Sequence, residues 1–152
     1  MSFEVAFTFD GQEQMVNRLR STARGVKDLS ESMSTIGLYL SHLYAGEVFA
    51  SRGGVIGEPW ARLSPDYAAE KARKWPGRPP LMRTGKMQSN FRFESDANSA
   101  RMYNPTPYFK YHQSSDPRSS NLPRRVMMKI DDMRRREVLR IIQAEINRKV
   151  NA

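Results

Sequence analysis

The chain has 152 residues, of which 39% are hydrophobic and 27% are charged, and its formal net charge is +9. This length and composition are typical of one globular domain with a modest core. No apolar run approaches the roughly 18 residues that a membrane helix needs, and the first residues lack the pattern of a secretory signal. The absence of cysteine excludes disulfides, thiolate zinc sites and cysteine nucleophiles. We therefore expect a single domain over residues 1–152, with no membrane partner.

The positive charge is unevenly distributed along the sequence. Residues 1–70 contain 6 Lys or Arg against 9 Asp or Glu, whereas residues 71–152 contain 19 against 7. Such an asymmetry suggests a basic face that meets a polyanion or an acidic partner. The alternative is a basic surface that only keeps the protein in solution, and net charge alone does not separate these two interpretations.

Residues 3–10 alternate between large apolar residues and smaller or polar ones. Phe3, Val5, Phe7 and Phe9 fall on one face. A period of two, rich in aromatic and β-branched residues, predicts a strand. Its apolar face needs a covering layer, and the helices that follow are the nearest candidates.

A helical pattern begins at Gln12, from which apolar residues recur at spacings of three and four. We expect a first helix that ends near Arg24. A second helix is expected to begin at Asp28 or Ser30 and to end at Ser51, with the Ser30 hydroxyl as its N-cap. The apolar stripe lacks regular charge pairing at its flanks, which favours a helix against a core over a coiled coil.

Residues 49–57 contain three glycines and are predicted to end this helix in a flexible loop. Such loops often carry contacts to partners, so Gly53 and Gly54 are candidate interface residues. No Gly-Lys-Ser or Gly-Lys-Thr follows them, which excludes a phosphate-binding P-loop.

A short helix is predicted from Pro65 to Lys74. The hydroxyl of Ser64 is suited to cap it, and proline is favoured at the first helical position. The helix ends at Trp75 because a residue that precedes proline avoids helical angles. Tyr67, Ala68 and Ala72 are assigned to one side of this helix, and Glu70, Lys71, Arg73 and Lys74 mostly to the other. Trp60 and Trp75 are interpreted as residues that cover the core.

Residues 76–80 contain three prolines and a glycine and predict a stiff loop that lines a partner surface. A proline-rich recognition ligand is the competing interpretation, although one turn of such sequence is weak evidence for it. We expect three mobile loops, near residues 52–58, 76–80 and 114–121.

A β-hairpin is predicted from residues 90–94 and 100–104, with polar turn residues between them. Residues 81–87 are predicted to form one turn of helix before it. Another strand is expected to run through Ile130.

The last helix is predicted to extend to about Val150, with Asp131 or Asp132 as its N-cap. Its apolar residues recur at four-residue steps and form one face that packs on the sheet. Arg134 and its two following arginines lie in the first turn, where positive charge opposes the helix dipole. They are interpreted either as a partner-facing group or as a solvated face.

The order of these features resembles the phage virion morphogenesis family, whose best-known members are the Mu-like G proteins and the P2-like tail-completion proteins. The pattern is a glycine-and-proline turn, a tryptophan, a Leu-Ser helix cap, a lysine in the helix and a Thr-Gly step into a hairpin. The matching positions are Gly57, Pro59, Trp60, Leu63, Ser64, Lys71, Leu81, Thr84 and Gly85.

Two later segments also resemble this family. Residues 108–113 are similar to an aromatic segment that ends in His-Gln, although Ser114 and Ser115 replace the glycine that usually follows. Residues 122–127 are similar to an Ile-Pro-Ala-Arg-Pro-Phe element, of which the proline and one arginine match. The resemblance extends from about Met33 to Ile146.

The resemblance implies an α+β fold in which a small antiparallel sheet packs against a long helix, with N-terminal and C-terminal helices. It implies a structural role in completing the tail and joining it to the head, as a homohexameric ring around the DNA path. The implied partners are the chain itself, neighbouring connector or adaptor proteins, tail-tube or tail-terminator proteins, and packaged DNA held without sequence specificity. The implied location is the neck or upper tail of the virion, after assembly in the host cytoplasm.

Three groups of candidate site residues follow. Basic residues that face DNA or a partner are expected at Lys74, Arg78, Arg124, Arg125, Arg134 and Arg135. Interface loops are expected to contain Gly53, Gly54, Pro79, Pro80 and Ser115. The family motif is expected to form a core of Trp60, Leu63, Ser64, Leu81, Thr84 and Gly85.

The sequence offers no arrangement that favours catalysis. Asp131 and Asp132 are better explained as a helix cap than as an acid–base pair. His42 is interpreted as a core or interface residue and His112 as a packing residue. We therefore expect no catalytic residue, no metal and no cofactor. The alternatives are a stand-alone nucleic-acid-binding protein without sequence preference and an adaptor for acidic proteins.

Overall fold

The structure is a computed structural model that describes residues 4–7, 27–114 and 122–151. These residues form an α+β fold that divides into two units, each built from segments far apart in the sequence. Unit 1 comprises Met1–Glu4, His42–Arg92 and Tyr103–Lys129, and unit 2 comprises Val5–Ser41, Phe93–Met102 and Ile130–Ala152. No helix in the described ranges combines the length and the apolar character needed to cross a membrane.

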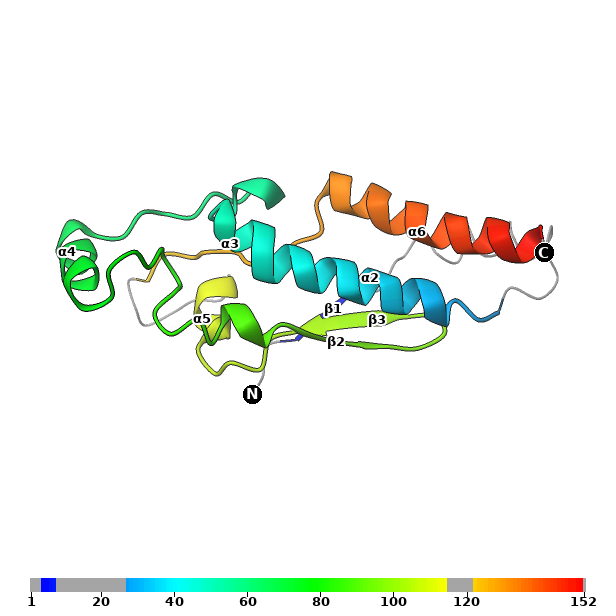
Figure 1. Ribbon diagram of the computed structural model, residues 1–152, viewed down its shortest axis with the longest axis horizontal. Coiled ribbons are helices and arrows are strands. Elements are labelled where there is room, and N and C mark those ends of the chain that lie inside the picture. Colours follow the sequence, from blue (N-terminus) through cyan, green and yellow to red (C-terminus); the bar gives the residue numbers. More distant parts are fainter. Residues whose placement is uncertain (1–3, 8–26, 115–121, 152) are drawn as a thin grey trace. The chain divides into compact units, whose positions relative to one another are not determined.

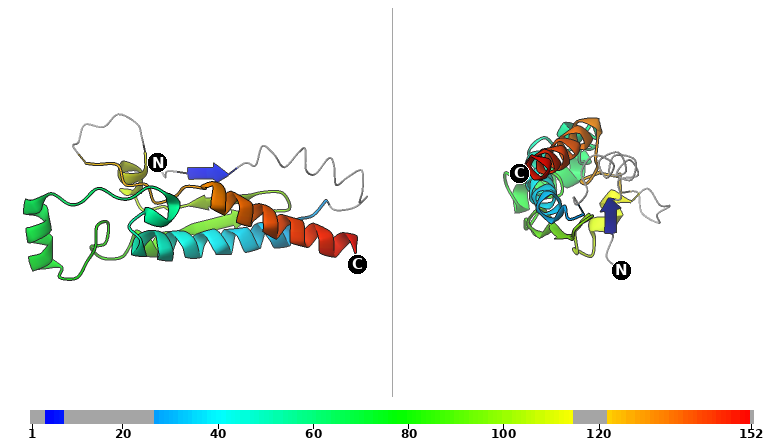
Figure 2. Two further views of the ribbon diagram at one scale, coloured as in Figure 1. Left: turned by 90° about the horizontal axis from the view of Figure 1, so that it is seen from above. Right: turned by 90° about the vertical axis from the view of Figure 1, so that its right-hand side faces the viewer.

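Unit 2 contains the sheet and the two longest helices, apart from single end residues that belong to unit 1. The sheet has the strand order β1-β3-β2, with β2 and β3 forming the predicted antiparallel hairpin. In Figure 1 and Figure 2, α2 and α6 run alongside each other. The bounds are Glu4–Phe7 for β1, Ser30–His42 for α2, Arg92–Ser95 for β2, Ala100–Tyr103 for β3 and Asp132–Val150 for α6.

The sheet packs against α2, as the predicted fold class requires. Gly37 of α2 allows this close approach, because a Cβ atom at that position would lie 2.2 Å from the ring of Phe93. The amide of Leu29 donates a hydrogen bond of 2.9 Å to the carbonyl of Ala97 in the hairpin turn. Strand β3 shows the expected alternation, since Ala100 and Met102 are buried while the residues after each are half-buried.

One carboxylate organises the hairpin turn between β2 and β3. Asp96 accepts hydrogen bonds of 2.8 Å from the amides of Asn98 and Ser99 and from the Ser99 hydroxyl. These bonds, with the Asn98 amide first, lower the pKa of Asp96 because they favour its ionised form. The polar turn predicted from the sequence is thus closed by its own side chains.

The starts of α2 and α6 are both capped by aspartate. Asp131 accepts a hydrogen bond of 3.1 Å from the Arg134 amide, which confirms one of the two predicted caps. At α2 the predicted capping residue, Ser30, was wrong. Its amide and its hydroxyl both donate hydrogen bonds to the Asp28 carboxylate. Aspartate two residues earlier satisfies the first helical amide in place of the serine.

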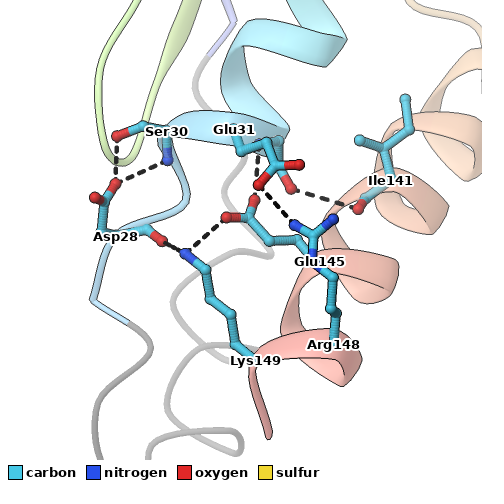
Figure 3. Close-up of polar contacts among 8 residues, drawn as sticks. Asp28, Ser30, Glu31, Ile141, Glu145, Arg148 and Lys149 are labelled. Atoms are coloured by element: carbon cyan, nitrogen blue, oxygen red, sulfur yellow. Dashed lines mark hydrogen bonds and ion pairs between the residues drawn. The ribbon is translucent and has the colours of Figure 1, made fainter. Parts of the chain in front are cut away.

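A polar network joins the first turn of α2 to the last turns of α6, and Figure 3 shows it. Glu145 is 4% exposed, accepts a hydrogen bond of 2.7 Å from the Ser32 amide and forms an ion pair of 2.7 Å with the Lys149 ammonium. Lys149 also donates to the carbonyl of Asp28. At the surface, Arg148 pairs with Glu31 at 2.7 Å. Groups from both helices therefore contact the buried carboxylate.

Unit 1 consists of short helices and turns around an aromatic cluster. The ring of Phe49 lies 5.2 Å from Trp60 and 6.2 Å from Phe91, and Phe91 lies 5.8 Å from Phe109 and 5.9 Å from Tyr44. Trp60 is 8% exposed, which confirms that it covers the core. The elements are a π-helix at Leu43–Glu47, α3 at Val48–Ala50, 3₁₀ turns at Gly54–Ile56 and Gln88–Asn90, α4 at Pro65–Lys74, and α5 at Phe109–Gln113.

The chain from 122 to 131 is not the predicted strand, since the structure assigns it no strand pairing. Side chains satisfy its backbone instead. Gln113 accepts from the amides of Met127 and Met128 at 2.8 and 3.0 Å and donates to the Met128 carbonyl at 2.7 Å. The Trp60 indole donates to Val126 at 2.7 Å. These bonds replace a neighbouring strand.

One further local prediction was wrong. Leu81 has a φ of +63°, which a right-handed helix does not allow, so residues 81–87 form turns and the helical turn comes later, at Gln88–Asn90. The segment after α3 is a hydrogen-bonded turn in which Gly53 donates to Val48 at 2.8 Å and accepts from Glu58 at 3.0 Å. Gly53 is buried there, with a φ of +81°.

The remaining element predictions agree with the structure or lie outside it. The helix predicted up to Ser51 ends at Ala50, and α4 has the predicted bounds. Strand β1 lies within the predicted residues 3–10. Three predictions lie outside what the structure describes. They are the face formed by Phe3 and its neighbours, the helix ending near Arg24, and the loop at 114–121 apart from Ser114.

We predict that Glu145→Ala lowers the free energy of unfolding by about 2 kcal/mol at pH 7, because it leaves a buried amide and an ammonium without their partner. Burial alone would raise the pKa of Glu145, but the hydrogen bonds from Lys149 and Ser32 leave it below its ordinary 4.5. The stabilisation is thus complete above pH 4.5 and is lost as pH falls through the lowered pKa. Urea unfolding at several pH values measures it.

The matched control for this variant is Glu137→Ala on the same helix, where the carboxylate pairs with the exposed Arg140. We expect this change to leave the urea midpoint nearly unmoved. Equal losses for the two variants would contradict the assignment of the buried Glu145 as the important carboxylate.

We also predict that Gln113→Ala lowers the free energy of unfolding by about 3 kcal/mol, because three buried backbone groups lose their partners. The control is Gln143→Ala, whose amide bonds only to Asn147 at the surface, at 2.8 Å. Urea unfolding of both variants measures the difference. A loss at Gln113 no larger than at Gln143 would show that the 126–128 segment does not need its amide.

Candidate functional site

Folding concentrates the positive charge in one unit. Unit 1 contains 14 Lys or Arg against 6 Asp or Glu, whereas unit 2 contains 11 against 10. The asymmetry of charge along the sequence therefore becomes an asymmetry between the units. Unit 2 includes the arginines of α6, but its carboxylates nearly equal its cations in number. The site with the greatest electrostatic attraction for an anion is expected in unit 1.

Unit 1 contains a cavity of about 860 Å³, which we call the basic pocket. It lies between the start of α4, the turns at 81–87, α5 and the segment at 122–125. Its volume is in the range of ligand-binding pockets. No Asp or Glu is among the described residues that line it, whereas five lining residues are cationic: Arg62, Lys71, Arg83, Lys86 and Arg125.

Lys71 is the only buried residue of α4, with 4% of its surface exposed. Its ammonium donates a hydrogen bond of 2.7 Å to the carbonyl of Pro79. Burial lowers the pKa of Lys71, and the charge of the nearby Arg125 lowers it further. Both effects mean that the protonated amine would gain from a negative partner.

Arg125 is the second buried cation of the basic pocket, and it too is 4% exposed. Its guanidinium donates to the carbonyls of Ala61 at 2.9 Å and Arg62 at 3.2 Å. Burial lowers the pKa of Arg125, although the nearby Tyr67 hydroxyl opposes this. The guanidinium holds the turn before α4 in place, and no carboxylate is among the described residues that line the pocket around it.

The wall of the basic pocket opposite α4 has an unusual backbone. Leu81 adopts a φ of +63° and Gly85 a φ of +79°. A left-handed leucine costs about 1–3 kcal/mol and persists where the surrounding structure imposes it, often at functional sites. Between these residues the Thr84 hydroxyl accepts a hydrogen bond of 3.3 Å from the Lys86 amide.

Large apolar side chains stand at the edge of the basic pocket. Tyr67 is 42% exposed, Tyr108 is 41% exposed and Leu122 is 47% exposed. Further in, Leu63 and Leu81 are half-buried. The pocket thus combines recessed positive charge with exposed apolar surface, which suits an anionic group attached to an apolar one.

A smaller cavity of about 510 Å³ lies on the other side of Lys71 and Leu63. Trp75, Pro79 and Pro80 line it, together with the exposed Arg78. Trp75 is half-buried, so its predicted burial is only partial, and the guanidinium of Arg83 lies 4.8 Å from the centre of its ring.

The six residues of the predicted motif core lie in two different places. Only Trp60 belongs to the core, whereas the other members line the basic pocket and none of them is fully buried. Ser64 occupies the N-cap position of α4 but makes no capping hydrogen bond. The pocket-lining members are Leu63, Ser64, Leu81, Thr84 and Gly85.

The predicted partner-facing cations divide between exposed and buried positions. Arg125 and Arg134 are buried, which corrects their assignment to an outer face: the Arg134 side chain is 7% exposed and pairs with Asp131 at 3.0 Å. The exposed ones are Lys74, Arg78, Arg124 and Arg135. Of these, Lys74 pairs with Glu70, and Arg124 donates a hydrogen bond of 3.0 Å to the Gln113 carbonyl.

The predicted interface loops are only partly exposed. Gly53 is buried against Trp60, so its assignment to an exposed loop was wrong, whereas Gly54 is exposed. Pro79 and Pro80 are half-buried. Ser115 lies outside the described residues.

Sequence reasoning missed most of the pocket-lining cations, and Lys71 in particular was placed on the polar side of α4. Its spacing of four from Tyr67 and from Trp75 puts it on the same helical face as these aromatic residues, which was the available signal. His112 is half-buried and lines the basic pocket, while His42 is exposed, not in the core. The described residues contain no group of three His, Asp or Glu that would hold a metal ion.

No family model, no curated protein and no solved structure matches this chain. The function is therefore argued from the sequence resemblance and from the geometry of unit 1.

We predict that Lys71→Met leaves the free energy of unfolding at pH 7 equal to that of the wild type or about 1 kcal/mol higher, because an apolar side chain replaces a buried charge. The pKa of Lys71 is lowered in the folded state, so wild-type stability rises as pH increases from that pKa to the ordinary 10.5. This rise is absent from the variant. Urea unfolding across this pH range measures both effects.

The control is Arg73→Met, which removes an exposed cation from the same helix. It is expected to keep the wild-type pH dependence. A large loss of stability in Lys71→Met alone would show instead that the bond to Pro79 outweighs the burial of the charge.

Proposed function

We propose that this chain is a structural protein of a phage virion that completes the tail and joins it to the head. In this proposal, copies of the chain form a homohexameric ring around the DNA path at the neck. A ring suits the size of the chain, because one small subunit does not surround a duplex whereas cyclic symmetry uses one interface repeatedly. Its partners are neighbouring connector, adaptor and tail-tube or tail-terminator proteins, together with packaged DNA.

The observation that carries the proposal is the position of the motif residues. The resemblance rests on short pieces spread between Gly57 and Phe93, each weakly specific. Folding gathers six of the nine matching positions around one cavity, in the unit that holds most of the excess positive charge: Leu63, Ser64, Lys71, Leu81, Thr84 and Gly85. This arrangement is expected of a functional element that is kept together, and it supports the family assignment more than scattered positions would.

The exposed cations supply the chemistry that such a ring needs. Arg78 and Arg124 are exposed in unit 1, and Arg135 is exposed in unit 2. Cations repeated around a lumen hold DNA through its phosphates without reading its sequence. The same cations also suit the alternative of a stand-alone nucleic-acid-binding protein, so charge does not separate the two proposals.

Deletion of residues 78–80 from the phage-encoded chain tests the proposal. We expect unjoined heads and tails in electron micrographs and a fall in infectious titre, because the loop contributes Arg78 and two prolines to the contact surface. The wild-type gene supplied on a plasmid is the control and restores joined particles. Normal numbers of infectious, tailed virions would contradict the proposed role of this loop.

The mass of the purified protein, measured alone and with DNA, separates the neck role from the alternative. A ring, alone or in the presence of partner proteins, supports the neck role. A monomer that binds DNA with an affinity falling steeply with salt supports the stand-alone nucleic-acid-binding protein.

A further inference from the structure

We propose that the basic pocket binds an acidic segment of a partner protein, in which aspartate or glutamate flanks an aliphatic or aromatic residue. This goes beyond the neck role, which uses the exposed cations and assigns nothing to the pocket. That the partner is a neighbouring virion protein rests on the proposed function. The binding itself depends only on the geometry of unit 1.

The first argument is the uncompensated charge. Lys71 and Arg125 are each 4% exposed, and no carboxylate lines the pocket among the residues that the structure describes. The polar partners of their side chains are backbone carbonyls, at Pro79, Ala61 and Arg62. Neutral carbonyls satisfy hydrogen bonds but leave the net charge in place, and buried cations of this kind are stabilised by an anion.

The second argument concerns the shape of the anion. Lys71 lines the pocket and only 4% of its surface is exposed, so an anion must extend into the pocket to reach its side chain. A side-chain carboxylate stands at the end of a thin, flexible stem. A phosphodiester is flanked by sugars on both sides, and a DNA duplex presents a broad convex surface. The recessed charge therefore favours a carboxylate over nucleic acid.

The third argument is the apolar rim. Tyr67, Tyr108 and Leu122 are each more than 40% exposed at the edge of the pocket. Exposed apolar groups around a polar centre are typical of binding sites for protein segments. They provide contacts for an aliphatic or aromatic side chain next to the carboxylate, and duplex DNA offers no equivalent group.

The fourth argument is that the pocket is formed in advance. Arg125 is fixed by two carbonyls, and its own amide donates to the His112 carbonyl at 2.9 Å. Leu81 is held in a left-handed conformation in the facing wall. A site whose charges are already fixed loses little conformational entropy when the ligand binds, and this favours a short segment as ligand.

Fluorescence anisotropy of the purified full chain tests the proposal. The probe is a short fluorescein-labelled peptide that alternates glutamate with phenylalanine. We expect it to bind at low salt, and we expect a version with glutamine in place of glutamate to bind about tenfold more weakly or worse, because it loses the charge-assisted bonds. A version with serine in place of phenylalanine is expected to be weakened as well.

The variants locate the binding. Lys71→Met should weaken the glutamate peptide by about tenfold or more, and Lys86→Met, at an exposed position in the lining, should weaken it severalfold. Arg73→Met removes the same charge from α4 outside the pocket and should bind like the wild type. If Lys71→Met does not fold, the comparison of Lys86→Met with Arg73→Met decides the question.

Three results would overturn the proposal: no binding of the glutamate peptide at low salt, equal binding of its glutamine version, or equal effects of the pocket variants and Arg73→Met. Preferential binding of a labelled oligothymidylate that depends on Lys71 would instead identify a site for single-stranded nucleic acid. The peptide assay uses neither particles nor duplex DNA, so its failure leaves the neck role standing, and failure of the neck role leaves the peptide site to be judged alone.

Discussion

The side-chain amide of Gln113 is the contact on which the arrangement of unit 1 depends. It bonds to both amides and one carbonyl of Met127 and Met128 and thereby fixes a segment that has no neighbouring strand. This segment contains Arg125, whose guanidinium donates hydrogen bonds to the carbonyls of Ala61 and Arg62. Those residues lead into α4, and Arg62 lines the basic pocket. A single buried amide therefore links α5, the segment at 122–131 and the start of α4.

This linkage places Arg125 in the lining of the basic pocket, which Lys71 also lines. Unit 1 holds two buried cations whose hydrogen bonds go to backbone carbonyls, and no carboxylate lines their pocket among the described residues. Unit 2 treats its buried charges in the opposite way, since Glu145 is matched by Lys149 and Arg134 by Asp131. Matched charges are the ordinary condition of a buried ionic group, so the described residues of the two units differ in how their buried charges are paired.

Local sequence signals predicted much of the fold because their physics is local. Proline at the first position and a residue before proline at the end defined α4, and aspartate before an apolar repeat defined α6. The predictions that were wrong required distant partners. Leu81 adopts a left-handed conformation that its neighbours in the sequence do not predict. In the segment predicted as a strand through Ile130, the Met127 amide bonds to the Gln113 side chain and not to another strand. The residues that line the basic pocket were not predicted together, because they too come from segments that are distant in the sequence.

The sequence by itself determined the α+β class, the hairpin, the bounds of α4 and the excess of positive charge, and it limited the N-cap of α6 to two adjacent aspartates. Only the tertiary structure decided which cations are buried and which are exposed. Lys71 has charged residues on both sides in the sequence, and its burial comes from segments that are brought to α4 by folding. Helical periodicity reports one face of one element, whereas the charge balance among the described residues of a pocket depends on several segments and has no signature in any single stretch of the chain.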